Sequence, residues 1–152
     1  MPNHPRPRPI GLNHVAITVG DIDAAVSFYR SIFTFSLRGR SDTKAFIDMG
    51  DQFLAMAQTT VAADHADSTR HIGVVVDDAS LVEDRLADIG VTPLDTAGLD
   101  FHDPRGNRLQ IIEYADVQFT KAPQVLKGMD ATELEKRRSA IKELEAKGMA
   151  PK

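Results

Sequence analysis

An internal repeat is the feature that most constrains the fold of this 152-residue chain. The segment NHVAITVGDIDAAVSFYRSI, from Asn13, aligns without a gap with RHIGVVVDDASLVEDRLADI, from Arg70, at a constant offset of 57 residues. Each copy contains a histidine, an apolar strand pattern, a turn rich in aspartate and an amphipathic helix pattern. Each βα unit is too small to bury its own apolar face, so the two are expected to pack together. The predicted buried helix faces contain Ala25, Phe28, Tyr29 and Ile32 in the first copy and Leu81, Val82, Leu86 and Ile89 in the second.

Short strand-like segments follow each predicted helix. They are FTFSLRG, KAFIDMG and QFLAMAQ in the first copy, and VTPLDTA, LDFHDPRG and RLQIIEY in the second. Gly50 and Gly106 mark matching turns, and Asp103 is expected to hold the second turn by accepting backbone N–H groups. We therefore predict an α+β fold of two tandem βαβββ units, at 11–59 and 70–115. Their sheets should pair into a half-barrel around one concave cleft.

The two ends of the chain differ from the repeat. Proline alternates with polar residues at the start, which predicts a disordered tail over 1–10. The repeat accounts for a domain over 11–116, and 117–152 form an extension. Within it, Thr132 and Glu135 match a capping box ahead of apolar residues at helical spacing, so a helix is expected over about 132–147. This helix either packs on its own domain or reaches a second subunit.

Composition restricts the partners. The formal net charge is -4 and there is no block of Lys and Arg, so neither nucleic acid nor an anionic membrane surface is favoured. No apolar run approaches the length of a membrane span, and a cytoplasmic location is the expectation. The chain has no cysteine, so a metal ion would have to be held by histidine, carboxylate or amide groups.

Three motifs in order resemble the vicinal oxygen chelate superfamily, also called the glyoxalase, bleomycin-resistance and extradiol-dioxygenase fold. They are LNHVAITVGDIDAAVSFY, then RHIGVVVDD, then FHDPRGNRLQIIEY, and the resemblance covers about Gly11 to Ala115. The family includes isomerases, dioxygenases, thiol transferases that modify antibiotics, and metal-free drug binders. The motifs therefore predict the fold far more strongly than the activity.

The resemblance implies metal ligands at His14 and His71, which hold matching places in the two copies. It places the last ligand four residues after Gly106, at Gln110, where metal-binding relatives have a glutamate. Glu113 lies three residues further along the strand and is expected to point to the opposite face. The predicted site is thus His14, His71 and Gln110 around a divalent ion, either Mn, Ni, Zn or Fe.

An amide at the third ligand position changes the expected chemistry. It adds no negative charge, and unlike a carboxylate it cannot accept a proton from a carbon acid, which disfavours glyoxalase-type isomerisation and extradiol dioxygenation. Asp100 and His102 share a strand face and are the candidate acid–base pair. The alternative is that His102 caps the turn from outside. Phe53 and Ala55 are expected to line the substrate site.

Three functions are compatible with these observations. The first is a metal-dependent lyase, isomerase or transferase acting on a small molecule. The alternative is a metal-free protein of the bleomycin-resistance type that binds a drug or metabolite. A third is a degenerate module that serves through its dimer surface. We expect a homodimer, because chains of this family with a single pair of units commonly build their clefts by pairing, sometimes with exchanged halves.

Overall fold

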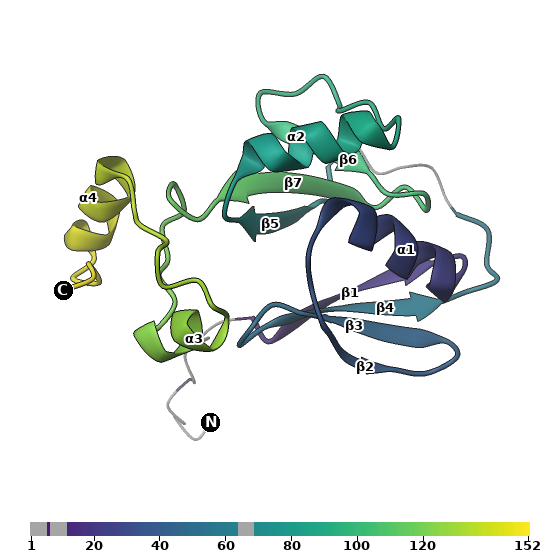
Figure 1. Cartoon of the computed structure of the whole chain (residues 1–152), viewed down its shortest axis with the longest axis horizontal. Coiled ribbons are helices and arrows are strands. Elements are labelled where there is room, and N and C mark those ends of the chain that lie inside the picture. Colours follow the sequence, from purple (N-terminus) through teal and green to yellow (C-terminus); the bar gives the residue numbers. More distant parts are fainter. Residues whose placement is uncertain (1–5, 7–11, 64–68) are drawn as a thin grey trace, which may run out of the picture.

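The first unit forms a four-stranded sheet (Figure 1). The computed structural model describes residues 6, 12–63 and 69–152, so the tail predicted over 1–10 lies outside the described residues apart from Arg6. Strand β1 pairs in parallel with β4, and the other pairings are antiparallel in the order β1-β4-β3-β2. The elements are β1 (His14–Val19), α1 (Ile22–Ile32), β2 (Leu37–Arg40), β3 (Lys44–Asp48) and β4 (Phe53–Gln58).

The second unit has one strand fewer than predicted. Its sheet has the order β5-β7-β6, with β5 and β7 parallel. The prediction of a strand at VTPLDTA is wrong, because Pro93 offers no N–H and Leu94 and Thr96 bond locally to Gly98 and Asp100 instead. The α+β fold with two paired sheets and no closed barrel is confirmed. The elements are β5 (Ile72–Val76), α2 (Ala79–Asp88), β6 (Leu99–His102) and β7 (Arg108–Glu113).

Matching contacts repeat in the two units. Asp21 and Asp78 cap the N-termini of α1 and α2 with their side chains. The last residue of each central strand also reaches the neighbouring helix. Gln58 Oε1 accepts the first N–H of α1, and Glu113 Oε1 accepts the first N–H of α2. The repeat predicted from sequence is therefore a structural repeat.

One apolar core runs through both units, between the sheets and the inner faces of α1 and α2. Helix α1 buries the predicted face, with Tyr29 only 1% exposed. Helix α2 buries Val82 and Leu86, but Leu81 is 56% exposed and Ile89 follows the end of the helix. The predicted face of the second helix was thus too wide, because a three-stranded sheet offers less surface to cover.

A hydrogen-bonded cluster around Asp103 joins the two units. Tyr29 on α1 donates its hydroxyl to Asp103 Oδ2 at 2.9 Å. The same carboxylate accepts the N–H groups of Arg105 and Asn107 and the side-chain amide of Asn107, which also donates to the carbonyl of Thr18. The structural role predicted for Asp103 is confirmed, and it extends beyond its own turn.

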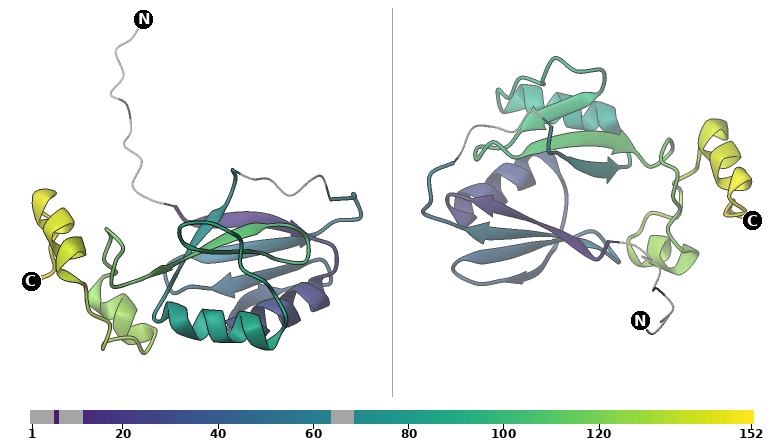
Figure 2. Two further views of the ribbon diagram at one scale, coloured as in Figure 1. Left: turned by 90° about the horizontal axis from the view of Figure 1, so that it is seen from above. Right: turned by 180° about the vertical axis from the view of Figure 1, so that it is seen from behind.

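The C-terminal extension lies to one side of the two sheets, near the beginning of β1 (Figure 2). It contains α3 (Pro123–Gly128) and α4 (Arg138–Ala146). The predicted start of the helix at Thr132 is wrong, because α4 is preceded by Arg137, whose N–H binds the carbonyl of Ala115. No helix in the described part of the chain is long and apolar enough to cross a membrane.

Contacts with both units hold the extension in place. Lys136 Nζ lies 3.5 Å from the centre of the Tyr114 ring and donates to the carbonyls of Tyr114 and Val117. Lys121 donates to the carbonyl of Met49 at 3.1 Å and pairs with Asp51, both in the β3–β4 turn. The extension thus packs on its own domain, which was one of the two predicted arrangements.

Candidate functional site

The sheet of the first unit has one face in the core and one open face. Leu54 and Met56 of β4 are buried, so Phe53 and Ala55 project from the opposite face. His14 lies directly across from Phe53 in the register of β1 and β4. His14 and the two residues expected to line the substrate site therefore share the open face of the first sheet.

The His14 ring is held in one orientation. It stacks on the ring of Phe53, with centroids 4.8 Å apart and an interplanar angle of 10°. Its Nδ1 lies 2.8 Å from Oδ1 of Asn13. With this amide oxygen as the acceptor, Nδ1 carries the hydrogen, and a neutral ring then presents its lone pair at Nε2. That tautomer is the one a metal-binding imidazole needs when it binds through Nε2.

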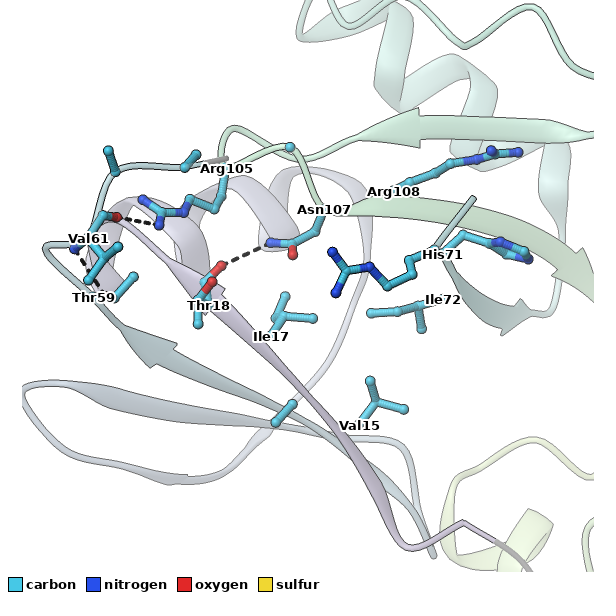
Figure 3. A pocket seen from close by; sticks show the side chains of 15 residues that line it. Val15, Ile17, Thr18, Thr59, Val61, His71, Ile72, Arg105, Asn107 and Arg108 are labelled. Carbon is cyan, nitrogen blue, oxygen red and sulfur yellow. Dashed lines mark hydrogen bonds between the residues drawn. The ribbon is translucent and has the colours of Figure 1, made fainter. Parts of the chain in front are cut away.

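His71 is fixed in the same tautomer. Its Nδ1 lies 2.8 Å from the backbone carbonyl oxygen of Thr69, which only accepts a hydrogen bond. The residue lines a cavity of about 600 Å³ between β1, the start of β5 and the β6–β7 turn (Figure 3). Asn107 reaches across this region to the carbonyl of Thr18. Other polar side chains on the lining are Thr59, Arg70, Arg105 and Arg108.

Gln110 lies on the open face of the second sheet. Its neighbours on β7, Leu109 and Ile111, are buried, whereas Gln110 is half-buried and lies opposite Gly73 of β5. Glu113 has the other parity, accepting from the first N–H of α2 and pairing with Arg137 at 2.7 Å. The prediction that Glu113 faces away from Gln110 is confirmed.

Asp100 is directly opposite Gln110 in the β6–β7 register and is completely buried. Its Oδ2 accepts from Arg108 Nε at 2.8 Å and from Nη2 at 2.7 Å. Its Oδ1 accepts from the Thr96 hydroxyl. Both oxygens of this carboxylate thus accept from neighbouring donors, and sequence reasoning missed its arginine partner. The opposite charges at Asp100 and Arg108 flanking a tight turn were the available signal.

His102 lies two residues from Asp100 on β6, opposite Arg108. Its Nε2 is buried and has no hydrogen-bond partner among the described residues. A buried ring nitrogen without a partner is uncommon in a folded protein. The acid–base role of His102 and Asp100 stays a prediction.

The cavity that His71 lines includes neither His14 nor Gln110 among its lining residues. Figure 1 shows β1 and β5 running in opposite directions, and His14 and His71 lie at the starts of these strands. Among the described residues, no group of three or more His, Cys, Asp and Glu side chains could hold a metal ion. The predicted site residues fall into two groups, called half-sites, one on each unit. The first half-site is His14 with Phe53 and Ala55, and the second is His71 with Gln110.

Comparisons with known proteins agree with this architecture. A profile of the Glyoxalase/Bleomycin resistance protein/Dioxygenase superfamily matches residues 11–111. Metallothiol transferase FosB of Bacillus licheniformis is 25% identical over 114 residues, covering 67% of this chain and 74% of the relative. Glutathione transferase FosA of Serratia marcescens is 27% identical over 110 residues, covering 66% and 78%.

Solved structures share the fold at lower sequence identity. The fosfomycin resistance protein FosX from Mesorhizobium loti has a TM-score of 0.55 and 22% identity, covering 68% of this chain and 92% of that one. An integron cassette protein of V. cholerae has a TM-score of 0.57 and 19% identity, covering 72% and 98%. These likenesses extend over the two units that carry the half-sites.

Proposed function

Because the chain belongs to the Glyoxalase/Bleomycin resistance protein/Dioxygenase superfamily, we propose that it binds a divalent metal ion through His14, His71 and Gln110. In this proposal it acts on a small molecule as a lyase, isomerase or transferase. The observation that carries the proposal is the shared tautomer of the two histidines. Each donates from Nδ1 to a nearby oxygen and keeps the Nε2 lone pair for a metal ion.

The donor set fits a divalent transition metal, although it binds more weakly than one with a carboxylate. Two neutral imidazoles and an amide oxygen suit Mn, Ni, Zn or Fe, but none of them offsets the charge of the ion. A bound ion of this kind supplies Lewis acidity to oxygen atoms of a ligand. Gln110 can orient a bound ligand but cannot accept a proton as a carboxylate does. Proton transfer therefore requires another group on the same face.

His102 is the proposed group for that transfer. It shares the open face of the second sheet with Gln110, and its buried Nε2 has no partner within the described chain. Asp100 takes a different role from the one first expected. Its ion pair with Arg108 joins β6 to the strand that carries Gln110, and its second oxygen accepts from the Thr96 hydroxyl.

The complete site is proposed to form between two copies of the chain. The first half-site would come from one protomer and the second from the other, which brings His14 to His71 and Gln110. Two features support this arrangement. Strands β1 and β5 are each at the edge of their sheet, and the cavity lined by His71 includes neither His14 nor Gln110. A twofold axis joins such edges in a self-complementary way.

A metal-free binding protein is the second candidate function. The observation that favours it is the amide at Gln110, which adds no negative charge to a metal site. In that case the open faces would hold a small molecule without converting it. The names of the two curated relatives, a metallothiol transferase and a glutathione transferase, favour the metal-dependent transferase instead.

Metal titration distinguishes the two candidates. Protein stripped with a chelator is titrated with Mn, Ni, Zn and Fe(II) in a calorimeter, and bound metal is counted by mass spectrometry. The proposal predicts micromolar binding that His14→Ala and His71→Ala abolish and Gln110→Glu tightens. Glu113→Gln is the matched control, since that side chain faces α2, and it should leave metal affinity unchanged. Wild-type protein without metal affinity would instead support the binding protein.

A further inference from the structure

Strand β2 contains a β-bulge that changes which of its side chains reach the open face. Leu37 lies opposite Ile47, but the next paired residue is Gly39, opposite Phe46. Arg38 is therefore the extra residue at the shift in register. Bulges of this kind re-aim a side chain and are frequent beside functional sites. Without the bulge, Leu37 and Gly39 would occupy one face and Arg38 the other.

Arg38, at the shift in register, and Arg40, after it, point in different directions. Arg40 pairs with Asp23 of α1, on the helix side of the sheet. Arg38 instead places its guanidinium carbon 4.4 Å from the centre of the Phe53 ring, on the open face. No carboxylate in the described part of the chain pairs with Arg38. Its contact is the ring, which orients the guanidinium while leaving its N–H groups available.

Arg38 and His14 lie against the same aromatic side chain. The His14 ring is 4.8 Å from the Phe53 ring, and Phe46 meets Phe53 edge to face at 5.8 Å. The distances of the Arg38 guanidinium and the His14 imidazole to the Phe53 ring set an upper limit on the separation between these two groups. Ala55, directly opposite Phe46 in the register, adds a small side chain to this face. The Arg38 cation and the rings of His14 and Phe46 therefore all contact Phe53 on the open face.

We infer that this face binds a small ligand through an acidic group, a carboxylate or a phosphonate, held by Arg38. The inference rests on the proposed function in placing the ligand beside His14. A guanidinium donates two parallel N–H bonds to either anion. The apolar part of the ligand lies on Phe46, Phe53 and Ala55. Asp48 is the acidic residue opposite Phe53 in the register, and its carboxylate accepts the N–H of Gly50 at 2.6 Å within the β3–β4 turn.

The test uses benzoate and phenylphosphonate as probes, with benzamide as the neutral analogue of benzoate. Dissociation constants are measured by calorimetry on the full chain, once stripped of metal and once loaded with Mn or Zn. We expect one or both anions to bind, the stronger identifying the acidic group. Benzamide should bind roughly tenfold more weakly or worse. Arg38→Ala should cost the anion roughly tenfold or more, with Arg38→Lys intermediate.

Arg40→Ala is the matched control, because it removes an arginine of the same strand that faces the helix. It should change anion affinity by less than about twofold. The inference is overturned if neither anion binds, if benzamide binds as well as benzoate, or if Arg38→Ala has no effect. Failure of the metal titration with Arg38-dependent anion binding intact would overturn the proposed function alone. Metal binding without an effect of Arg38→Ala would overturn only this inference.

Discussion

Replacing Tyr29 with phenylalanine removes the hydroxyl that joins the two units. This hydroxyl donates to Asp103 at 2.9 Å, and both residues are buried, at 1% and 5% exposure. Burial, together with the neighbouring charge of Asp103, raises the pKa of Tyr29 far above its usual range, so the phenol is a donor at every ordinary pH. A hydrogen bond to a charged group contributes about 1.5–3 kcal/mol.

Tyr29→Phe should fall near the lower end of that range, about 2 kcal/mol. The Asp103 carboxylate keeps its three donors from Arg105 and Asn107 and is not left unsatisfied. Asp103→Ala should cost more, at least about 3 kcal/mol, because the Tyr29 hydroxyl then has no acceptor in the core. In a chain of this length, 2 kcal/mol corresponds to a decrease in Tm of about 4–8 °C.

Urea unfolding followed by circular dichroism measures both variants. Tyr114→Phe is the matched control, because its hydroxyl meets the neutral hydroxyl of Thr120 at 2.9 Å and should contribute about 1 kcal/mol or less. The double variant Tyr29→Phe, Asp103→Ala completes a thermodynamic cycle with the two single variants. If Tyr29→Phe changed the unfolding free energy by less than about 0.5 kcal/mol, the role of this cluster in joining the units would be refuted.

Three further perturbations test other parts of the structure. Asp100→Ala should lower the unfolding free energy by about 3–5 kcal/mol, because it removes the carboxylate that pairs with the largely buried Arg108. A loss below about 1 kcal/mol in urea unfolding would contradict this role of the ion pair. Gly50→Ala should lower the unfolding free energy by about 1–3 kcal/mol, because Gly50 has φ of 89° and a methyl group would collide with Met129. Hydrogen exchange should show faster opening of α3, and unchanged protection would count against the contact between Gly50 and Met129. The hydrogen bond and charge of Lys121 lower the pKa of Asp51. The stability that this pair contributes is therefore complete above the unfolded pKa of 3.8 and is lost as pH falls through the lower folded pKa. Asp51→Asn should remove that acid sensitivity from the NMR signal of the Met129 methyl group, and a pH profile identical to that of the wild type would contradict the assignment.

The repeat and the turn signal DPRGN were enough to predict the architecture. Local patterns encode both, and the contacts that cap α1 and α2 repeat with the sequence. The missing strand at VTPLDTA shows the limit of such patterns. There, Thr96 bonds to Asp100, a residue that becomes its neighbour only when β6 forms. The start of α4 was misplaced for a similar reason, since Arg137 is held by Glu113 and Asp116 from the end of the second unit.

For the candidate site, strand parity was the most reliable guide. It separated Gln110 from Glu113 correctly because side chains alternate strictly along β7. Two features required the structure. The hydrogen bonds of His14 and His71 depend on neighbouring oxygens, and the separation of Arg38 from Arg40 onto different faces depends on a bulge whose position no local pattern specified.

Mixing two inactive variants tests the central claim most directly. If the metal site takes His14 from one protomer and His71 from the other, neither the His14→Ala dimer nor the His71→Ala dimer contains an intact site. A mixed dimer has one intact site and one site lacking both histidines. We predict that neither variant alone binds metal at micromolar concentration, and that a mixture exchanged to equilibrium recovers about one quarter of the wild-type sites. No recovery in dimers verified by light scattering would contradict a site shared between protomers.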